Sequence, residues 1–439
     1  MPFGRCWIAR RVLFGFAAAL ALGAASGQAT PYLVVDADSD QVLMENEATA
    51  PWYPASLTKL MTVYVALDAV RSGKLTLDTP LVMSMRAARM PPSKMGFRPG
   101  TEVTLDNALK MLMVKSPNDV AVMVAEGVSG SIEAFADDMN ADAQRLGLHE
   151  SHFVNPNGLH NPAHVSSARD MALIARALLR EFPDHADLFS IGAIELGNRY
   201  IPNHNGLLGR YPGADGMKTG FTCPAGFNVV ASANHNGRRL IVVVLGASKA
   251  RARNQEAADL FDRGFAMGGG AGSLESLPSG SGAPPNMRAD VCLHRSAAAL
   301  AAAEDDGIPD QAQAAAGAAG MLPGPLGALF APVAAHTELT YERIRFDPVP
   351  VYIGPAPGWK GPALGARPTA ETAGAPGAKT MSPNASADAS ASEGDASEPV
   401  LLSSKSKVKL ARHTKKGTAA HKPVKSAAGK SAKKDVSTD

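Results

Sequence analysis

The 439-residue sequence has little cysteine, few aromatic side chains and no long apolar run. It has three cysteines, and Cys6 lies near the amino end, so a disulfide-rich scaffold is excluded. The apolar run over residues 12–25 is shorter than the about 20 residues that a membrane-spanning helix needs. Aromatic residues make up 5% of the chain and most of them lie before residue 267, so only this part is expected to bury a sizeable core.

The amino end has the features of a secretory signal. Three arginines precede the apolar run, and small residues suited to a signal peptidase follow it. We therefore expect residues 1–29 to be a signal peptide and the protein to act in the periplasm or cell envelope, with an uncleaved anchor as the less favoured alternative. In an exported chain, Cys223 and Cys292 would form one disulfide bridge at most.

Charge is distributed unevenly along the chain. The net charge is +2, but residues 401–439 hold eleven Lys and Arg against two Asp. Ala, Gly and Ser separate these cations, so the tail is predicted to be disordered. It is either a solvated tail or an electrostatic tether to the anionic envelope, and export excludes a nucleic-acid partner. Residues 267–400 are rich in Ala, Gly and Pro and are predicted to form a mostly disordered linker, with one strand-like patch at 339–354.

Apolar periodicity between residues 30 and 266 predicts an α+β domain. Residues 31–46 and 226–248 each hold two apolar runs around a turn, as in a β-hairpin, and Asn236-Gly237 suits the second turn because both residues tolerate positive φ. Helices are predicted over residues 56–71, 104–115, 118–126, 131–146, 166–182 and 249–265. Strands at both ends of this unit with helices between them favour the α+β class.

The first helix begins with an unusual pair of polar residues. Ser56 and Lys59 are three positions apart, so their side chains share one helical face. A serine hydroxyl is a weak nucleophile until a base removes its proton, and a neighbouring lysine can do so where its neutral form is favoured. The spacing alone proves little, because S-x-x-K also occurs in the basic tail.

Two further motifs follow in order. Ser116-Pro117-Asn118 stands at a break between two helices, and Lys218-Thr219-Gly220 precedes an apolar strand. A serine–lysine pair, an S-x-N corner and K-T-G are together the signature of penicillin-binding proteins and class A β-lactamases. S-P-N recurs once in the linker, whereas K-T-G occurs once in the chain. The ordered triple therefore indicates a serine nucleophile in an acyl-transfer site.

With these motifs, the sequence resembles the low-molecular-mass penicillin-binding D-alanyl-D-alanine carboxypeptidases. The similarity extends over roughly residues 31–266, through YPASLTKLMT, MLMVKSPNDVAVMVAE, SHFVNPNGL, SSARDMALIARAL and DGMKTGFTCPAGFNVVASA. It implies a β-lactamase/transpeptidase-like domain over residues 30–266, in which an antiparallel sheet packs with a helical cluster. It also implies an enzyme that trims the terminal D-alanine from peptidoglycan stem pentapeptides, is acylated by β-lactams and needs no metal or organic cofactor.

The resemblance assigns catalytic roles to the first two motifs. Ser56 would attack the carbonyl between the two terminal D-alanines, and Lys59 would accept its proton. Ser116 would relay a proton to the leaving amine, and Asn118 would hold the peptide amide of the substrate. Water would then hydrolyse the acyl-enzyme.

The third motif receives binding roles on the same grounds. Lys218 would supply positive charge, the Thr219 hydroxyl would bind the terminal carboxylate, and Gly220 completes the motif. Backbone N–H groups of Ser56 and Phe221 would form the oxyanion hole, where one donor is typically worth about 3–4 kcal/mol.

Some features depart from the family's commoner pattern. Pro117 stands where Ala or Gly is usual, and its fixed φ is expected to stiffen the S-x-N corner. His204 lies where many relatives have arginine or another polar residue, which puts a second contact to the carboxylate in doubt. The β-rich second domain and the amphipathic anchoring helix of many relatives are not evident in the sequence.

Three other functions remain as alternatives. A D,D-endopeptidase that cuts peptidoglycan cross-links has the same motifs. A class A β-lactamase needs an E-x-x-L-N loop, which is absent between Asn118 and Lys218. A non-catalytic wall-binding protein would keep the fold but gives no covalent adduct with penicillin, and the intact motif residues argue against it.

Other polar residues suggest no second chemistry. The histidines at 149, 152, 160 and 164 match no zinc pattern, so we expect a loop with surface histidines and no metal site. Cys223 lies five residues past Lys218, where a small buried filler is favoured over a thiol that acts in the cleft.

Overall fold

The computed structural model describes residues 30–293, 295–296, 339 and 343–365. All of them fall in one compact unit, Met1–Ser382. The predicted signal peptide, the basic tail and most of the predicted linker lie outside the described residues and stay predictions. No helix in the described part of the chain is long and apolar enough to cross a membrane.

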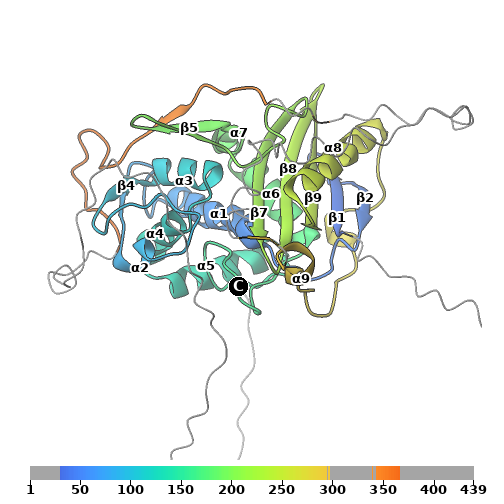
Figure 1. The fold of residues 1–439 in the computed structure, drawn as a ribbon, viewed down its shortest axis with the longest axis horizontal. Helices are drawn as coiled ribbons and strands as arrows, with labels where there is room; N and C mark the ends of the chain where they lie inside the picture. Colours follow the sequence, from blue (N-terminus) through green and yellow to red (C-terminus); the bar gives the residue numbers. More distant parts are fainter. Residues whose placement is uncertain (1–29, 294, 297–338, 340–342, 366–439) are drawn as a thin grey trace, which may run out of the picture. The chain divides into compact units, whose positions relative to one another are not determined.

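A five-stranded antiparallel sheet in the order β2-β1-β9-β8-β7 forms the centre of the fold (Figure 1). Its strands are β1 (Tyr32–Asp36), β2 (Val42–Asn46), β7 (Ala214–Thr222), β8 (Gly226–His235) and β9 (Arg238–Ala247). Both predicted hairpins are confirmed, and Asn236 and Gly237 adopt φ of 53° and 86° in the second turn. The strand β7, which carries K-T-G, is an edge strand.

Helices cover both faces of this sheet. The helices are α1 (Thr58–Arg71), α2 (Met85–Ala88), α3 (Leu105–Val114), α4 (Asn118–Ser129), α5 (Ile132–Arg145), α6 (Ala168–Glu181), α7 (Asp187–Ser190), α8 (Ala250–Ala266) and α9 (Arg288–Val291), with 3-10 turns η1 (Ala55–Leu57), η2 (Pro183–His185) and η3 (Leu274–Ser276). On one face, Val34 and Val242 pack with Phe261 of α8. The residues next to them along the strands point to the other face, where they belong to the hydrophobic cluster that includes α6. Because both faces are covered, β9 is apolar over the continuous run Leu240 to Leu245.

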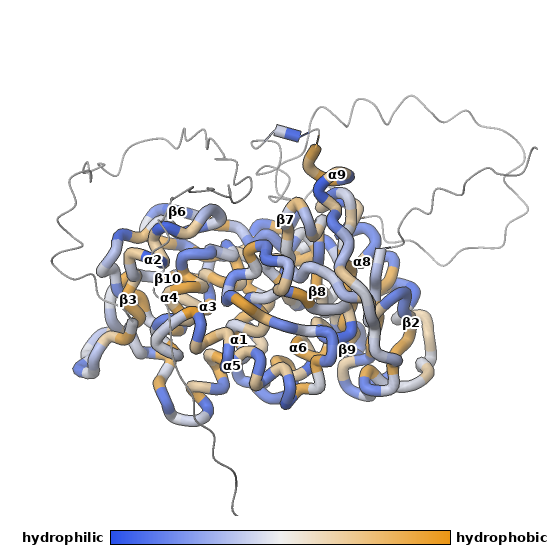
Figure 2. The backbone as a smooth tube through the Cα atoms, turned by 90° about the horizontal axis from the view of Figure 1, so that it is seen from below, coloured by the Kyte–Doolittle hydropathy of each residue, from blue (hydrophilic) through white to orange (hydrophobic). Residues whose placement is uncertain are grey.

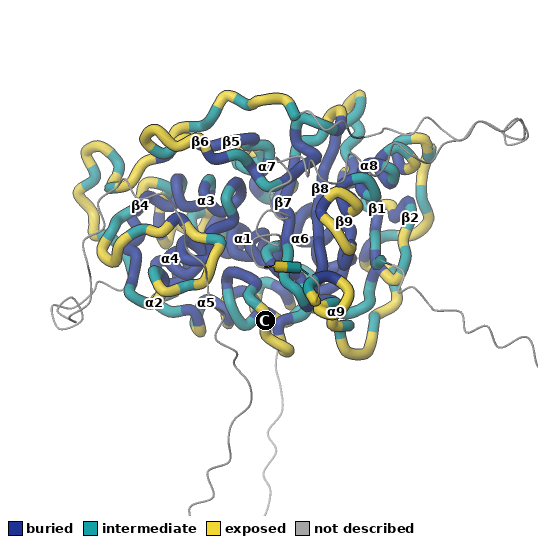
Figure 3. The backbone as a smooth tube through the Cα atoms, viewed as in Figure 1, coloured by how far each residue is buried: buried dark blue, intermediate teal, exposed yellow. Residues whose placement is uncertain are grey.

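The helical cluster lies beside the sheet, and α1 and α4 are buried along nearly all of their length (Figure 3). Hydrophobic stretches follow α1, α6 and β8 through this interior (Figure 2). Side-chain oxygens cap the starts of α3, α5 and α6: Thr104, Ser131 and Ser167 each accept a hydrogen bond from a backbone N–H three residues further on. These caps confirm the predicted helix starts to within a residue.

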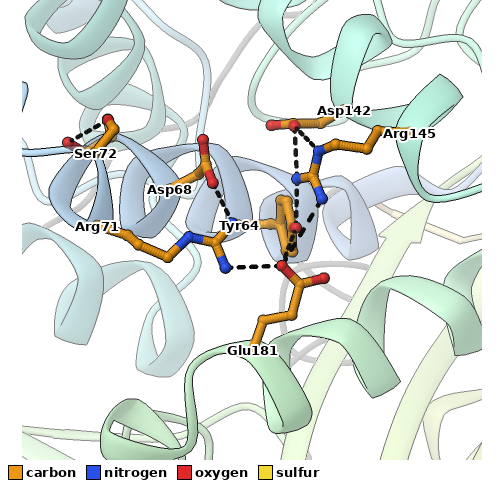
Figure 4. Close-up of polar contacts among 8 residues, drawn as sticks. Tyr64, Asp68, Arg71, Ser72, Asp142, Arg145 and Glu181 are labelled. Atoms are coloured by element: carbon orange, nitrogen blue, oxygen red, sulfur yellow. Dashed lines mark hydrogen bonds and ion pairs between the residues drawn. The ribbon is translucent and has the colours of Figure 1, made fainter.

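A polar cluster fixes three of these helices to one another (Figure 4). The Tyr64 hydroxyl of α1 donates to Glu181 of α6 at 2.7 Å and accepts from Arg145 of α5 at 2.5 Å. Burial and the neighbouring carboxylate raise the pKa of Tyr64 to about 12, so the phenol stays protonated. Arg71 adds a 2.8 Å ion pair to Glu181.

Two small sheets of short strands complete the described structure. These are β3 (Pro80–Val82) with β4 (Glu102–Thr104), and β10 (Val349–Val351), β5 (Ala193–Leu196) and β6 (Arg199–Pro202) in that order. The strand β10 comes from the predicted strand-like patch and pairs in parallel with β5. The strands β3 to β6 were not predicted, because strands of three or four residues show too little alternation of apolar and polar residues.

The two cysteines outside the predicted signal form a disulfide. Cys223, just after β7, pairs with Cys292, just after α9, with their Cα atoms 5.7 Å apart. The expectation that Cys223 is a small buried filler is therefore wrong, and the single bridge that was left open is present. It fixes residues after 266 to the end of the strand that carries K-T-G.

Candidate active site

Ser56 lies in the turn η1, directly before α1. Ala55 before it adopts a φ of 49°, a left-handed conformation that non-glycine residues rarely take. Lys59 is fully buried, and its Nζ donates to Ser56 Oγ at 3.0 Å. The predicted pairing of hydroxyl and amine on one helical face is thus present in the structure.

The Lys59 amine also reaches two other segments. It donates to Asn118 Oδ1 at 2.9 Å and to the main-chain oxygen of Asn157 at 2.7 Å. A buried ammonium or amine needs hydrogen-bond partners to offset its lost hydration. Lys59 therefore joins the first motif to the second, and both to the loop that contains Asn157.

The S-P-N corner is strained and firmly held. Ser116 has a φ of 59°, and its buried hydroxyl has no hydrogen-bond partner among the described residues. The side-chain amide of Asn118 donates to the carbonyls of Pro91 and Pro92 at 3.1 and 3.0 Å. Left-handed backbone at non-glycine residues costs on the order of 1–3 kcal/mol and clusters at functional sites. The corner thus presents a hydroxyl that is free to bind a ligand.

The K-T-G motif lies within β7 and precedes the apolar strand β8, as predicted. Lys218 is buried, and its Nζ donates to the Thr219 carbonyl at 2.8 Å. A Cβ on Gly220 would come within 2.9 Å of the Ser56 backbone nitrogen and 3.0 Å of the Pro54 oxygen. Glycine is therefore what allows β7 to approach the nucleophile turn so closely.

These segments line a single cleft. Seven of the eight predicted site residues line it, and the eighth, Lys59, lies behind Ser56 and bonds to it. The lining residues are Ser56, Pro92, Ser93, Ser116, Asn118, Asn157, Gly158, Leu159, His204, Lys218, Thr219, Gly220, Phe221, Thr222, Phe227 and Arg253. The first turn of one helix, the corner between two others and an edge strand therefore converge on one cavity.

Arg253, which was not predicted as a site residue, lines the cleft from α8 and is 2% exposed. Its guanidinium donates to Asn254 Oδ1 at 3.0 and 2.9 Å. One signal was available: Arg253 shares the apolar face of α8 with Ala257 and Phe261, and a charge on a buried face calls for a function. With Lys218 it adds positive charge to this end of the cleft.

Asn157 and Asn228 were also missed as site residues. Asn157 binds Lys59 through its carbonyl, so its side-chain identity gives no signal. Asn228 on β8 donates to the carbonyls of Tyr53 and Pro54 at 3.0 and 3.3 Å, and holds the turn before Ser56 against the sheet.

His204 lines the cleft together with Lys218 and Arg253. Burial, and then the positive charges of Lys115, Lys218, Arg253 and Arg343, lower the pKa of His204 to about 3. The imidazole is therefore neutral at physiological pH and offers one donor and one acceptor to a ligand.

The prediction of surface histidines holds for the exposed residues His149, His152 and His160 and is wrong for His164. His164 is 2% exposed, and its Nδ1 accepts from the Val154 backbone N–H at 3.1 Å. Its Nε2 therefore carries the proton and donates to Thr58 Oγ1 at 2.8 Å. Burial, with the positive charge of His152 and His160, lowers the pKa of His164 to about 3. The described residues include no group of three or more His, Cys, Asp or Glu placed to hold a metal ion.

This combination of fold and motifs places the protein in the class of penicillin-binding proteins and serine β-lactamases. Comparison with known families narrows the class. Residues 19–249 match the family model of peptidase S11, D-alanyl-D-alanine carboxypeptidase. The chain belongs to this family, which confirms the resemblance stated from the sequence.

Individual relatives agree with this assignment. The D-alanyl-D-alanine carboxypeptidase DacF of Bacillus subtilis (strain 168) is 35% identical over 244 residues, 55% of this chain and 63% of the relative. Penicillin-binding protein 5 from Haemophilus influenzae superposes with a TM-score of 0.52 at 36% identity, over 54% of this chain and 70% of that one. Penicillin-binding protein D2 from Listeria monocytogenes, in its ampicillin-bound form, gives 0.50 at 27% identity, over 54% and 96%. The chain spans 62% to 64% of the length of the first three curated relatives.

Proposed function

We propose that this protein is an exported serine-type D-alanyl-D-alanine carboxypeptidase that removes the terminal D-alanine from peptidoglycan stem pentapeptides. The observation that carries the proposal is the pair of hydrogen bonds that Lys59 Nζ donates, to Ser56 Oγ at 3.0 Å and to Asn118 Oδ1 at 2.9 Å. An amine in this place can remove the serine proton and return it later, so nucleophile and base need no cofactor.

The first half-reaction forms an acyl-enzyme. With its amine neutral, Lys59 accepts the proton of Ser56 as Oγ bonds to the carbonyl carbon of the penultimate D-alanine. Backbone N–H groups of Ser56 and Phe221 receive the oxyanion, and Gly220 allows β7 to lie close enough for the two donors to face one site. The tetrahedral intermediate expels D-alanine, whose amine gains a proton through Lys59 and Ser116.

The second half-reaction is hydrolysis. Water, deprotonated by Lys59, attacks the ester carbonyl, and Ser56 Oγ leaves and regains its proton. β-Lactams acylate the same serine, and the ampicillin-bound relative supports this part of the proposal.

Recognition of the substrate carboxylate falls to the cleft residues that β7 and α8 contribute. Thr219 binds the terminal carboxylate, and Lys218 and Arg253 supply the positive charge that favours an anion there. Because β7 is an edge strand, its outer main-chain groups are available to pair with an extended peptide. Asn118 holds the peptide amide of the substrate.

The proposal is tested with the mature protein and a pentapeptide that ends in D-Ala-D-Ala. We expect release of D-alanine and labelling by fluorescent penicillin, and loss of both in Ser56→Ala. A cross-linked dimer is offered in parallel. Cleavage of the dimer alone would make the protein a D,D-endopeptidase, and absence of both hydrolysis and labelling in the wild type would leave a wall-binding role.

The basic tail, residues 401–439, belongs to a separate part of the proposal. We propose that it tethers the enzyme to the anionic envelope, because each lysine near such a surface contributes about 1 kcal/mol of binding. Deletion of the tail should release the enzyme from the envelope fraction at low salt. Unchanged retention of the shortened protein would contradict the tether.

A further inference from the structure

We propose that Arg343 is a positioning residue for the carboxylate end of the cleft, although it lies 77 residues beyond the end of α8. It belongs to the segment 343–365, which contains β10. This segment runs over β5 and ends beside β3 and β4, the orange part of Figure 1. The inference rests on the proposed function, because it assigns the segment a part in binding the same substrate.

Arg343 fills the inside of a loop formed by residues 203–208. Its Nη1, Nη2 and Nε donate to the main-chain oxygens of Asn203, Asn205 and Leu208 at 2.7, 2.9 and 2.8 Å. These three residues are 3%, 0% and 1% exposed. Water cannot easily replace the lost donors at buried carbonyls, so the loop depends on the guanidinium for its shape. A lysine has the charge but not the planar fork that reaches three acceptors at once.

The loop in turn touches both walls of the cleft. The Asn205 side-chain amide donates to the Gly216 carbonyl of β7 at 2.9 Å, two residues before Lys218. The His204 backbone N–H donates to the Val114 carbonyl at 3.3 Å, two residues before Ser116. His204 itself lines the cavity. Arg343 thus acts on the second and third motifs through the loop, without lining the cleft.

The segment is anchored where Arg343 enters. The Phe346 ring occupies the space above two glycines: a Cβ on Gly192 would lie 2.1 Å from it and one on Gly209 2.9 Å from it. Further along, β10 pairs with β5, and Leu364 exchanges backbone hydrogen bonds with Pro80 and Val82 at 2.8 Å. The segment is therefore held firmly on the C-terminal side of Arg343, so Arg343 can fix the loop in one position.

The neighbouring Arg345 provides a matched control. It is exposed and lies over the Tyr200 ring at the surface, with 5.1 Å between its guanidinium carbon and the ring centroid. Arg345→Ala removes the same charge from the same segment but leaves the 203–208 loop intact.

The experiment compares Arg343→Ala, Arg343→Lys and Arg345→Ala in the full-length mature protein. KM and kcat are measured with the D-Ala-D-Ala pentapeptide, the efficiency of acylation with fluorescent penicillin, and hydrogen exchange at the amides of residues 203–208. For both Arg343 variants we expect KM to rise about tenfold, which corresponds to about 1.4 kcal/mol, with kcat within about twofold. Hydrogen exchange in the loop should quicken, and Arg345→Ala should match the wild type.

Several outcomes would overturn the inference. Unchanged KM in the Arg343 variants would show that the residue only attaches segment 343–365 to the rest of the protein. A normal KM in Arg343→Lys would show that charge matters and not the fork, and an equal rise in Arg345→Ala would show a general effect of lost charge. If Arg343→Ala does not fold, Arg343→Lys carries the test.

A wild type that neither hydrolyses the peptide nor binds penicillin refutes the proposed function and not the inference. If the wild type binds penicillin but does not hydrolyse the peptide, the efficiency of acylation replaces KM as the measured quantity.

Discussion

A single methyl group added at Gly158 should push apart two parts of the active site, the loop that contains Asn157 and the turn that holds Ser56. Its φ is 82°, and a Cβ there would lie 1.8 Å from the Ala55 carbonyl oxygen and 2.9 Å from Thr58 Oγ1. The residue before it, Asn157, supplies the carbonyl that binds Lys59. Gly158→Ala must therefore move either the turn that holds Ser56 or the loop that holds the base.

The expected loss of unfolding free energy in Gly158→Ala has two contributions. Left-handed backbone costs an L-residue about 1–2 kcal/mol, and overpacking against atoms that cannot move away adds about 1–3 kcal/mol. Gly130→Ala isolates the first term, since Gly130 has a φ of 86° and its Cβ would meet nothing within 4 Å. We expect Gly158→Ala to lose about 2–5 kcal/mol of unfolding free energy and Gly130→Ala about 1–2 kcal/mol.

Urea unfolding and the rate of acylation by fluorescent penicillin measure the two consequences. The Gly158 variant should unfold at lower urea than the Gly130 variant and acylate at least about tenfold more slowly, because a small misplacement of a reacting group costs this much or more. Equal urea midpoints, together with wild-type acylation by the Gly158 variant, would refute the close contact between loop and turn.

Two further predictions concern stability. Between pH 6.5 and about 3 the unfolded chain binds a proton at His164 that the folded protein does not, so stability rises with pH there and is lost as pH falls. His164→Asn should flatten the loss of urea midpoint between pH 7 and 4, and an unchanged slope would contradict this. The disulfide joins residues 69 apart, for which loop entropy gives about 4 kcal/mol. Cys223→Ala with Cys292→Ala should lower the unfolding free energy by about that amount, and an unshifted midpoint would count against the bridge.

Local signals in the sequence predicted much of the fold. Helix starts at Thr104 and Ser131 were found because a capping hydroxyl acts within three residues of its own position. The β8–β9 hairpin was predicted because Asn236-Gly237 fits the turn and an apolar run flanks it on each side. Ser56 and Lys59 were paired for the same reason, since their spacing fixes a shared helical face.

The rest of the site depends on contacts between distant segments, which leave weaker traces. The acceptors from Asn157, Asn203, Asn205 and Leu208 are main-chain oxygens, which every residue carries, so the side chains there do not mark the contact. Arg343 lies in the strand-like patch of the predicted linker, where nothing in the sequence marks its role, and only its partners in the folded chain reveal it. Motifs therefore identified the reacting groups, and the structure was needed to find what positions them.

The bonds made by Lys59 and the bonds made by Arg343 should also differ in how they link stability to catalysis. Lys59 receives its acceptors from three segments, Ser56, Asn118 and the loop at Asn157, and it is buried among them. Because the same bonds satisfy a buried amine and place the base, a change there must disturb folding and chemistry together. The Arg343 bonds go to the 203–208 loop and involve neither Lys59 nor the acceptors named above. Loosening them displaces a wall of the binding end while nucleophile and base keep their geometry, which is why KM should respond there and kcat should not.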